Sequence, residues 1–181
     1  PLRFPTLCLP PLRSLRCASR RSGTYAVPPA APVPYAVPMT DFCDATALAE
    51  LVRTGQVSAA ELVDEAIARV EATHDDIHAV IHPRFEAARS EAQTPLPGPL
   101  SGVPFLIKDL GAWQAGEPNH AGTRFLRDLD NRPAHDWVMT QRLRDSGLIF
   151  IGRTNTPEFG LISTTEPESH GRTRNPWNTE H

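Results

Sequence analysis

The sequence contains almost no lysine and little cysteine. Lys108 is the only lysine among 18 basic residues, and the rest are arginine. The three cysteines, Cys8, Cys17 and Cys43, form no close pair and no C-x-x-C motif. We therefore expect neither a disulfide framework nor a cysteine-based zinc site, and a reducing, cytoplasmic location is the default expectation. No apolar run approaches the roughly 18 residues of a membrane span, so no membrane partner is expected.

Acidic residues are absent from the first part of the chain. Residues 1–38 carry five arginines and no acid, whereas residues 39–181 carry 13 basic and 21 acidic residues. This acidic body does not fit a nucleic-acid-binding protein, so no nucleic-acid partner is expected. Residues 1–38 are also rich in proline, which prevents a sustained helix. We expect a disordered leader there, either an organellar transit peptide or an upstream stretch added by a misplaced start.

Several common binding signatures are missing. There is no G-x-G-x-x-G, no P-loop and no G-x-S-x-G, so neither a nucleotide cofactor nor a serine-hydrolase elbow is supported, and no cofactor is expected. His74, His78 and His82 recur every four residues, as ligands on a helix face would. However, Pro83 and the apolar run 79–81 indicate a turn into a short strand, where these imidazoles would not converge. We therefore expect no metal site.

The patterns that are present alternate between helix and strand. Ser58-Ala59-Ala60-Glu61 is a capping box that begins a helix, and further helices are expected after Asp41, at 84–92 and at 136–146. Short apolar runs at 103–107 and 148–151 predict strands, and the second shows no alternation, which suggests burial on both faces. This order indicates an α/β fold with helices over a sheet.

Lys108 directly follows the first of these apolar strands. Arginine is effectively never deprotonated, whereas a desolvated lysine can lose its proton and act as a base. The alternative is that Lys108 reaches water at the strand end and pairs with Asp109. The strand alone leaves both interpretations open.

Further motifs follow in a fixed order. They are Gly102-Val103-Pro104 leading to Ile107-Lys108-Asp109, Ala121-Gly122-Thr123, the run 152–160 (GRTNTPEFG), Thr164-Thr165-Glu166-Pro167, and the run 171–178 (GRTRNPWN). With these pieces the chain resembles the amidase signature family. The resemblance covers residues 39–181 and implies an α/β amidase signature fold, with a mixed central β-sheet covered by helices, of which this is the N-terminal part.

The resemblance implies amide hydrolysis by a triad of lysine, a serine with a cis peptide bond and a nucleophilic serine. Lys108 matches the base, and both serines would lie in a glycine- and serine-rich stretch after His181. Gly160 would lie near the bridging serine, and the hydroxyl of Ser163 could line the substrate entrance. Residues 39–181 alone are then expected to be inactive and poorly soluble, because the apolar strands 103–107 and 148–151 would be exposed edges.

The resemblance leaves alternatives for the whole protein. Thr164-Thr165-Glu166-Pro167 looks more like the free-standing amidases that act on small linear or cyclic amides, which could be homodimers. The runner-up is the amidase-type subunit of a glutamine-dependent tRNA amidotransferase, and a third candidate is an inert binding or scaffold fragment.

Overall fold

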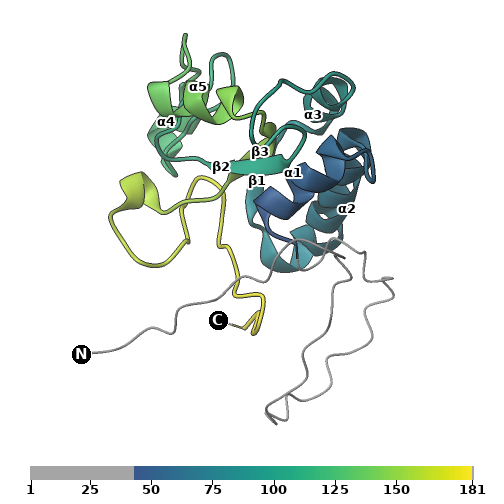
Figure 1. Cartoon of the computed structure of the whole chain (residues 1–181). Helices are drawn as coiled ribbons and strands as arrows, with labels where there is room; N and C mark the ends of the chain where they lie inside the picture. The colour runs from purple at the N-terminus through teal and green to yellow at the C-terminus, as the bar shows by residue number, and fades with distance from the viewer. Residues whose placement is uncertain (1–42, 181) are drawn as a thin grey trace, which may run out of the picture. The chain divides into compact units, whose positions relative to one another are not determined.

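The computed structural model describes residues 43–180. The expected leader at 1–38 lies outside these residues, so its disorder and the domain boundary after it remain predictions. In chain order the elements are α1 (Ala45–Arg53), α2 (Ala59–Ile77), β1 (Val80–Pro83), α3 (Phe85–Ala92), β2 (Pro104–Lys108), α4 (Arg124–Asp128), α5 (Val138–Asp145), β3 (Ile149–Thr154) and the 3-10 turn η1 (Glu158–Gly160) (Figure 1).

The three strands form one mixed sheet in the order β1-β3-β2. Strand β2 runs parallel to β3, with α4 and α5 in the connection between them, and β1 runs antiparallel to β3. Because β3 is central, its polar backbone groups are bonded on both sides and its side chains are covered on both faces. The predicted mixed α/β sheet is confirmed.

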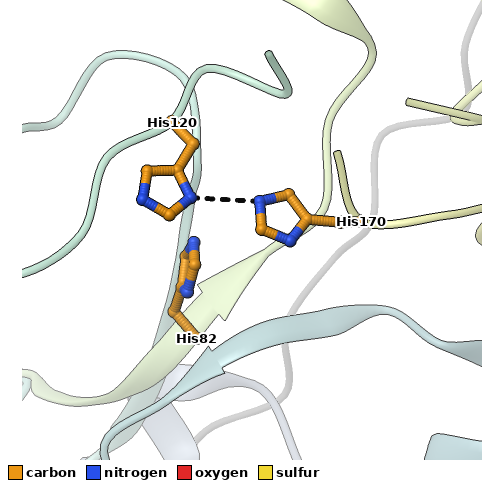
Figure 2. A group of neighbouring side chains, drawn as sticks. All are labelled: His82, His120 and His170. Carbon is orange, nitrogen blue, oxygen red and sulfur yellow. Dashed lines mark hydrogen bonds between the residues drawn. The ribbon is translucent and has the colours of Figure 1, made fainter. Parts of the chain in front are cut away.

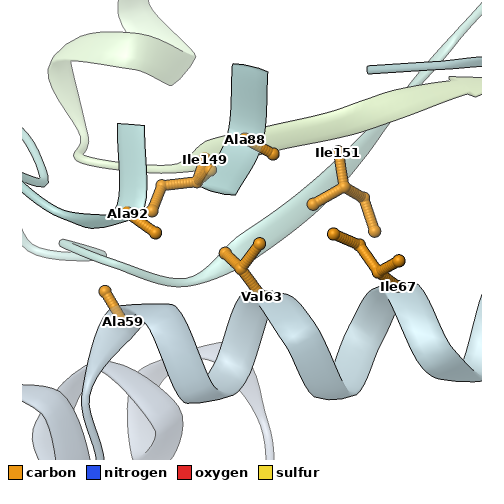
Figure 3. Close-up of a cluster of buried hydrophobic side chains, with 7 residues drawn as sticks. All are labelled: Ala59, Val63, Ile67, Ala88, Ala92, Ile149 and Ile151. Carbon is orange, nitrogen blue, oxygen red and sulfur yellow. The ribbon is translucent and has the colours of Figure 1, made fainter. Parts of the chain in front are cut away.

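One face of the sheet is covered by α2 and α3. Their small and branched side chains pack against the two isoleucines of β3, Ile149 and Ile151 (Figure 3). The cluster consists of Ala59, Val63, Ile67, Ala88, Ala92, Ile149 and Ile151. Alanine at the helix positions lets the helix backbones approach closely, while the isoleucines fill the space between them.

The opposite face carries a second apolar cluster, in which Phe150 and Leu148 pack with Val103, Ile107 and residues of α1. The run 148–151 is buried throughout, so the prediction of burial on both faces is confirmed. The expectation that this run would be an exposed edge is wrong, because β1 and β2 flank it. The edge is β2, where Phe105 is 37% exposed.

The predicted helix starts and stops are also observed. The side-chain hydroxyl of Ser58 accepts from the backbone N–H of Glu61, and the Glu61 carboxylate accepts in return, which completes the capping box at α2. Gly147 has a φ of 89°, which suits the glycine that ends α5. The short helix α4 was not predicted from the sequence. None of the helices between residues 43 and 180 combines the length and apolarity that crossing a membrane requires.

Candidate functional site

Lys108 is the last residue of β2 and lies opposite Thr154, the last residue of β3. Because the two strands are parallel, their carboxyl ends meet at one edge of the sheet, which we call the carboxyl edge. Ligands of α/β proteins characteristically bind at such an edge. The side chain of Lys108 is exposed, so the residues described here do not supply the desolvation that a lysine base requires.

Asp109 points to the interior. Its side chain is fully buried and accepts hydrogen bonds from the backbone N–H groups of His120 (3.1 Å) and Gly122 (3.3 Å). Burial raises the pKa of Asp109, against the opposing effects of these bonds and of nearby Arg153. Asp109 is therefore committed to the turn at 120–122, and the alternative of a Lys108–Asp109 ion pair is wrong. Adjacent residues of an extended chain point to opposite sides.

The turn at 120–122 needs glycine at its last position. Gly122 has a φ of 70°, and a Cβ atom there would lie 2.5 Å from the backbone oxygen of Thr156. The hydroxyl of Ser169 donates to the Gly122 carbonyl (2.7 Å), and the Phe159 N–H donates to the Ala121 carbonyl (2.9 Å). Motifs that are separate in the sequence thus pack against one another at the carboxyl edge.

Arg153 holds the loop that follows Lys108. The side chain is 1% exposed, and its guanidinium donates to the carbonyls of Pro118 (2.9 Å) and Ala112 (3.0 Å). Its Nε also lies 3.9 Å from Oδ1 of Asp109. Burial lowers the pKa of Arg153, and the neighbouring Asp109 opposes that shift. The sequence offered no local sign of this role, because it depends on loop carbonyls about 40 positions away.

Asn155 fixes the chain that leaves β3. Its side-chain amide donates to the carbonyl of Gly171 (2.9 Å) and to the hydroxyl of Thr173 (3.0 Å), while its oxygen accepts from the N–H of Thr156. The expectation that Asn155 ties down the loop after this strand is confirmed. These bonds return the segment 155–173 to the sheet.

Gly160 and Ser163 lie on the same segment. Gly160 ends η1 with a φ of 70°, and a Cβ atom there would lie 2.7 Å from the side chain of Leu110, so this turn abuts the residues just after Lys108. Ser163 is exposed and lies farther along the segment. The structure therefore places Gly160 beside the carboxyl edge, and the roles expected for Gly160 and Ser163 remain predictions.

A group of histidines lies behind the carboxyl edge. His74 is in α2, His78 caps that helix and His82 is in β1, and these three do not form a ligand cluster within the described chain. Instead His82 meets His120 and His170 (Figure 2). Burial lowers the pKa of His82 to about 3 and of His170 to about 4, so these two imidazoles are neutral at pH 7. Sequence reasoning missed this group because its members are far apart along the chain.

A cavity of about 260 Å³ lies elsewhere, between the end of α2 and the sheet. It is lined by Arg69, Val70, Thr73, His74, Ala79, Val80 and Leu106. None of the residues predicted to carry chemistry lines it. The carboxyl edge, which presents polar groups at strand ends, is the better candidate for the site.

Comparison with known proteins gives a consistent result. The sequence model of the family described as Amidase matches residues 61–181. The 6-aminohexanoate-cyclic-dimer hydrolase of Paenarthrobacter ureafaciens is 47% identical over 135 residues, which are 75% of this chain and 27% of that protein. One subunit of the glutamyl-tRNA(Gln) amidotransferase of Salinispora tropica is 39% identical over 150 residues, which are 77% of this chain and 30% of that protein.

The fold is similar as well. A solved structure of 6-aminohexanoate cyclic dimer hydrolase complexed with substrate matches with a TM-score of 0.72 at 47% identity, over 76% of this chain and 28% of that one. The chain thus spans less than a third of the length of these relatives.

Proposed function

The chain belongs to the amidase signature family, and from this premise we propose that the whole protein hydrolyses the C–N bond of a small carboxylic amide with Lys108 as its base. The observation that carries the proposal is the position of Lys108. It ends a strand at the carboxyl edge, its side chain is exposed, and its ammonium makes no hydrogen bond or ion pair with residues 43–180. It is therefore free to act on groups that approach this edge.

An amide carbonyl is a poor electrophile, so its hydrolysis requires an activated nucleophile and a proton for the leaving amine. In the proposed mechanism a neutral Lys108 takes the proton of a nucleophilic serine through a bridging serine, as the serine oxygen attacks the carbonyl carbon. The same proton then passes to the amine nitrogen as the C–N bond breaks. Water afterwards releases the acid from the acyl-enzyme.

Both serines are proposed to lie in a glycine- and serine-rich segment that follows His181 in the whole protein. The 181 residues would then provide one of the three catalytic groups and would not hydrolyse amides on their own. Packing of that segment over the carboxyl edge would also remove Lys108 from water, which favours the neutral amine.

The proposed substrate is a linear or cyclic amide of the kind named for the hydrolase that is 47% identical. The proposed location is cytoplasmic, and the proposed assembly of the whole protein is a homodimer without nucleic acid. The runner-up is the amidase-type subunit of a tRNA amidotransferase, supported by the 39% identity to a protein of that kind. Glutamine-dependent ammonia release together with a copurifying second protein would favour the runner-up.

The decisive experiment uses the protein with its encoded continuation and measures amine release from 6-aminohexanoate cyclic dimer. We expect Lys108→Ala to lower kcat by about 10²–10⁴-fold, the usual contribution of a general base. Lys108→Arg keeps the charge but cannot give up a proton, so it should be equally impaired. Arg142→Ala, which removes an exposed cation on α5, is the matched control and should keep full activity. Retention of activity by Lys108→Arg would refute the role of a base.

A further inference from the structure

The three histidines behind the carboxyl edge come from three separate parts of the fold. His82 lies on β1, His120 in the turn that Asp109 organises, and His170 in the segment that Asn155 returns to the sheet. One nitrogen of each ring lies within 4.8 Å of the others. Figure 2 shows the ring of His82 pointing toward the gap between the other two rings.

The ring geometry is ordered. The His120 and His170 rings are parallel, with an interplanar angle of 1°, and His120 Nδ1 lies 3.1 Å from His170 Nε2. The ring of His82 stands at 88° to both. Two nitrogens bound to one tetrahedral zinc ion lie about 3.3 Å apart, because each zinc–nitrogen bond is about 2.0–2.1 Å long. The His120–His170 pair is close to that spacing already, and a small rotation of His82 would bring in the third nitrogen.

Hydrogen bonding alone does not account for the group. A hydrogen bond between His120 and His170 satisfies one nitrogen of each ring, but Nε2 of His82 is buried and has no hydrogen-bond partner within the described chain. A buried polar atom without a partner is uncommon in a native structure and calls for an explanation, such as an ion or a water. An ion at the centre of the three rings would give His82 that partner.

The charges around the group permit a cation. The arginines whose charge acts on these rings are Arg127, Arg132 and Arg153. Each is already paired with a carboxylate, respectively Asp128, Asp130 and Asp109. Their positive charge is therefore largely compensated.

We propose that His82, His120 and His170 form a binding site for a divalent transition-metal ion of the zinc type, with water in the fourth position. Imidazole is a favoured ligand of zinc, copper and nickel, and three protein ligands leave one position open. The ion would join segments separated by 38 and 50 positions, and clips that close long loops constrain the unfolded chain most. It would also hold His120, whose N–H bonds Asp109, next to Lys108. This inference does not depend on the proposed amidase activity.

The test uses the untagged 181-residue chain, stripped with EDTA and titrated with Zn²⁺ in a calorimeter. We expect one ion per chain with micromolar or tighter affinity. Addition of Co²⁺ should produce the visible absorption of a four-coordinate ion with nitrogen ligands, without the thiolate charge-transfer bands that the cysteines would give. Zn²⁺ should also raise Tm by about 5 °C or more.

The variants locate the site. His170→Ala should weaken Zn²⁺ binding at least about 100-fold and abolish the rise in Tm, and His82→Ala should do the same, so the result does not depend on the folding of one variant. His135→Ala removes an exposed histidine outside the group and should bind as the parent does. Absence of Zn²⁺ uptake by the parent chain would overturn the proposal. Undiminished uptake by His82→Ala and His170→Ala, which indicates binding elsewhere, would overturn it as well.

Discussion

The two sides of the described fold are held together in different ways. Under α2 and α3 the contacts are apolar, between alanines, a valine and isoleucines that all lie in helices or in β3. At the carboxyl edge the buried groups are polar, and Asp109, Arg153 and Asn155 bond mainly to the backbone of loops. Hydrophobic burial has no direction, so it stabilises the sheet and helices as a unit. Hydrogen bonds are directional, so they determine where individual turns lie.

This difference predicts that damage to the apolar cluster lowers stability everywhere, whereas damage to the carboxyl edge also displaces the surroundings of Lys108. Amide hydrogen exchange and the free energy of unfolding together distinguish the two outcomes.

The largest effect is expected for Arg153→Met. This change leaves the buried carboxylate of Asp109 without its cation and the loop carbonyls of Pro118 and Ala112 without their donor. Breaking a buried ion pair on one side costs about 3–5 kcal/mol. Urea unfolding followed by circular dichroism measures the loss, and the amides of His120 and Gly122 should exchange faster.

The matched control for this change is Arg142→Met, at an exposed position of α5. It should change the free energy of unfolding by less than about 0.5 kcal/mol. Equal effects of the two variants would contradict the structural role of Arg153.

The next effect is expected for Ile67→Ala, in the apolar cluster. Ile67 is 1% exposed and packs between α2 and β3. Truncating a buried isoleucine costs about 2–5 kcal/mol, and we expect about 3 kcal/mol in the same urea experiment. Under native conditions the amides of His120 and Gly122 should keep their relative protection. A selective loss of protection at these two amides would show that the cluster and the edge are not separate.

A smaller effect is expected for Asn155→Ala. The substitution leaves the N–H of Thr156 and the carbonyl of Gly171 without their bonds to this side chain, which costs about 1–3 kcal/mol. The change should be local, so the Arg174 amide, which donates to the Ile77 carbonyl, should exchange faster than in the parent. Unchanged exchange at Arg174 would mean that other contacts hold this segment.

The smallest effect is expected for Ser58→Ala, at the start of α2. Loss of the cap leaves the N–H of Glu61 without its side-chain acceptor and costs about 1 kcal/mol. Ser90→Ala, at an exposed position of α3, is the matched control and should be neutral or slightly stabilising because alanine favours helix. A cost at Ser90 as large as that at Ser58 would argue against the capping box.

Much of the fold could be predicted from the sequence, because it depends on local patterns. Ser58 and Glu61 are three positions apart, so the start of α2 is specified by neighbours in the chain. The apolar run 148–151 indicated a strand buried on both faces, and the motif order from Lys108 to Asn175 indicated the family. Lys108 itself was singled out by its place at the end of a strand.

Only the tertiary structure determined which polar groups meet. Asp109 could pair with its neighbour Lys108 or turn inward, and the choice depended on amides at 120–122 that the fold brings beneath it. Arg153 finds its carbonyls, and His82 finds His120 and His170, across tens of positions. No periodicity records such contacts, because hydrogen bonds and ligand sets depend on the distance and direction between atoms in space rather than on spacing along the chain.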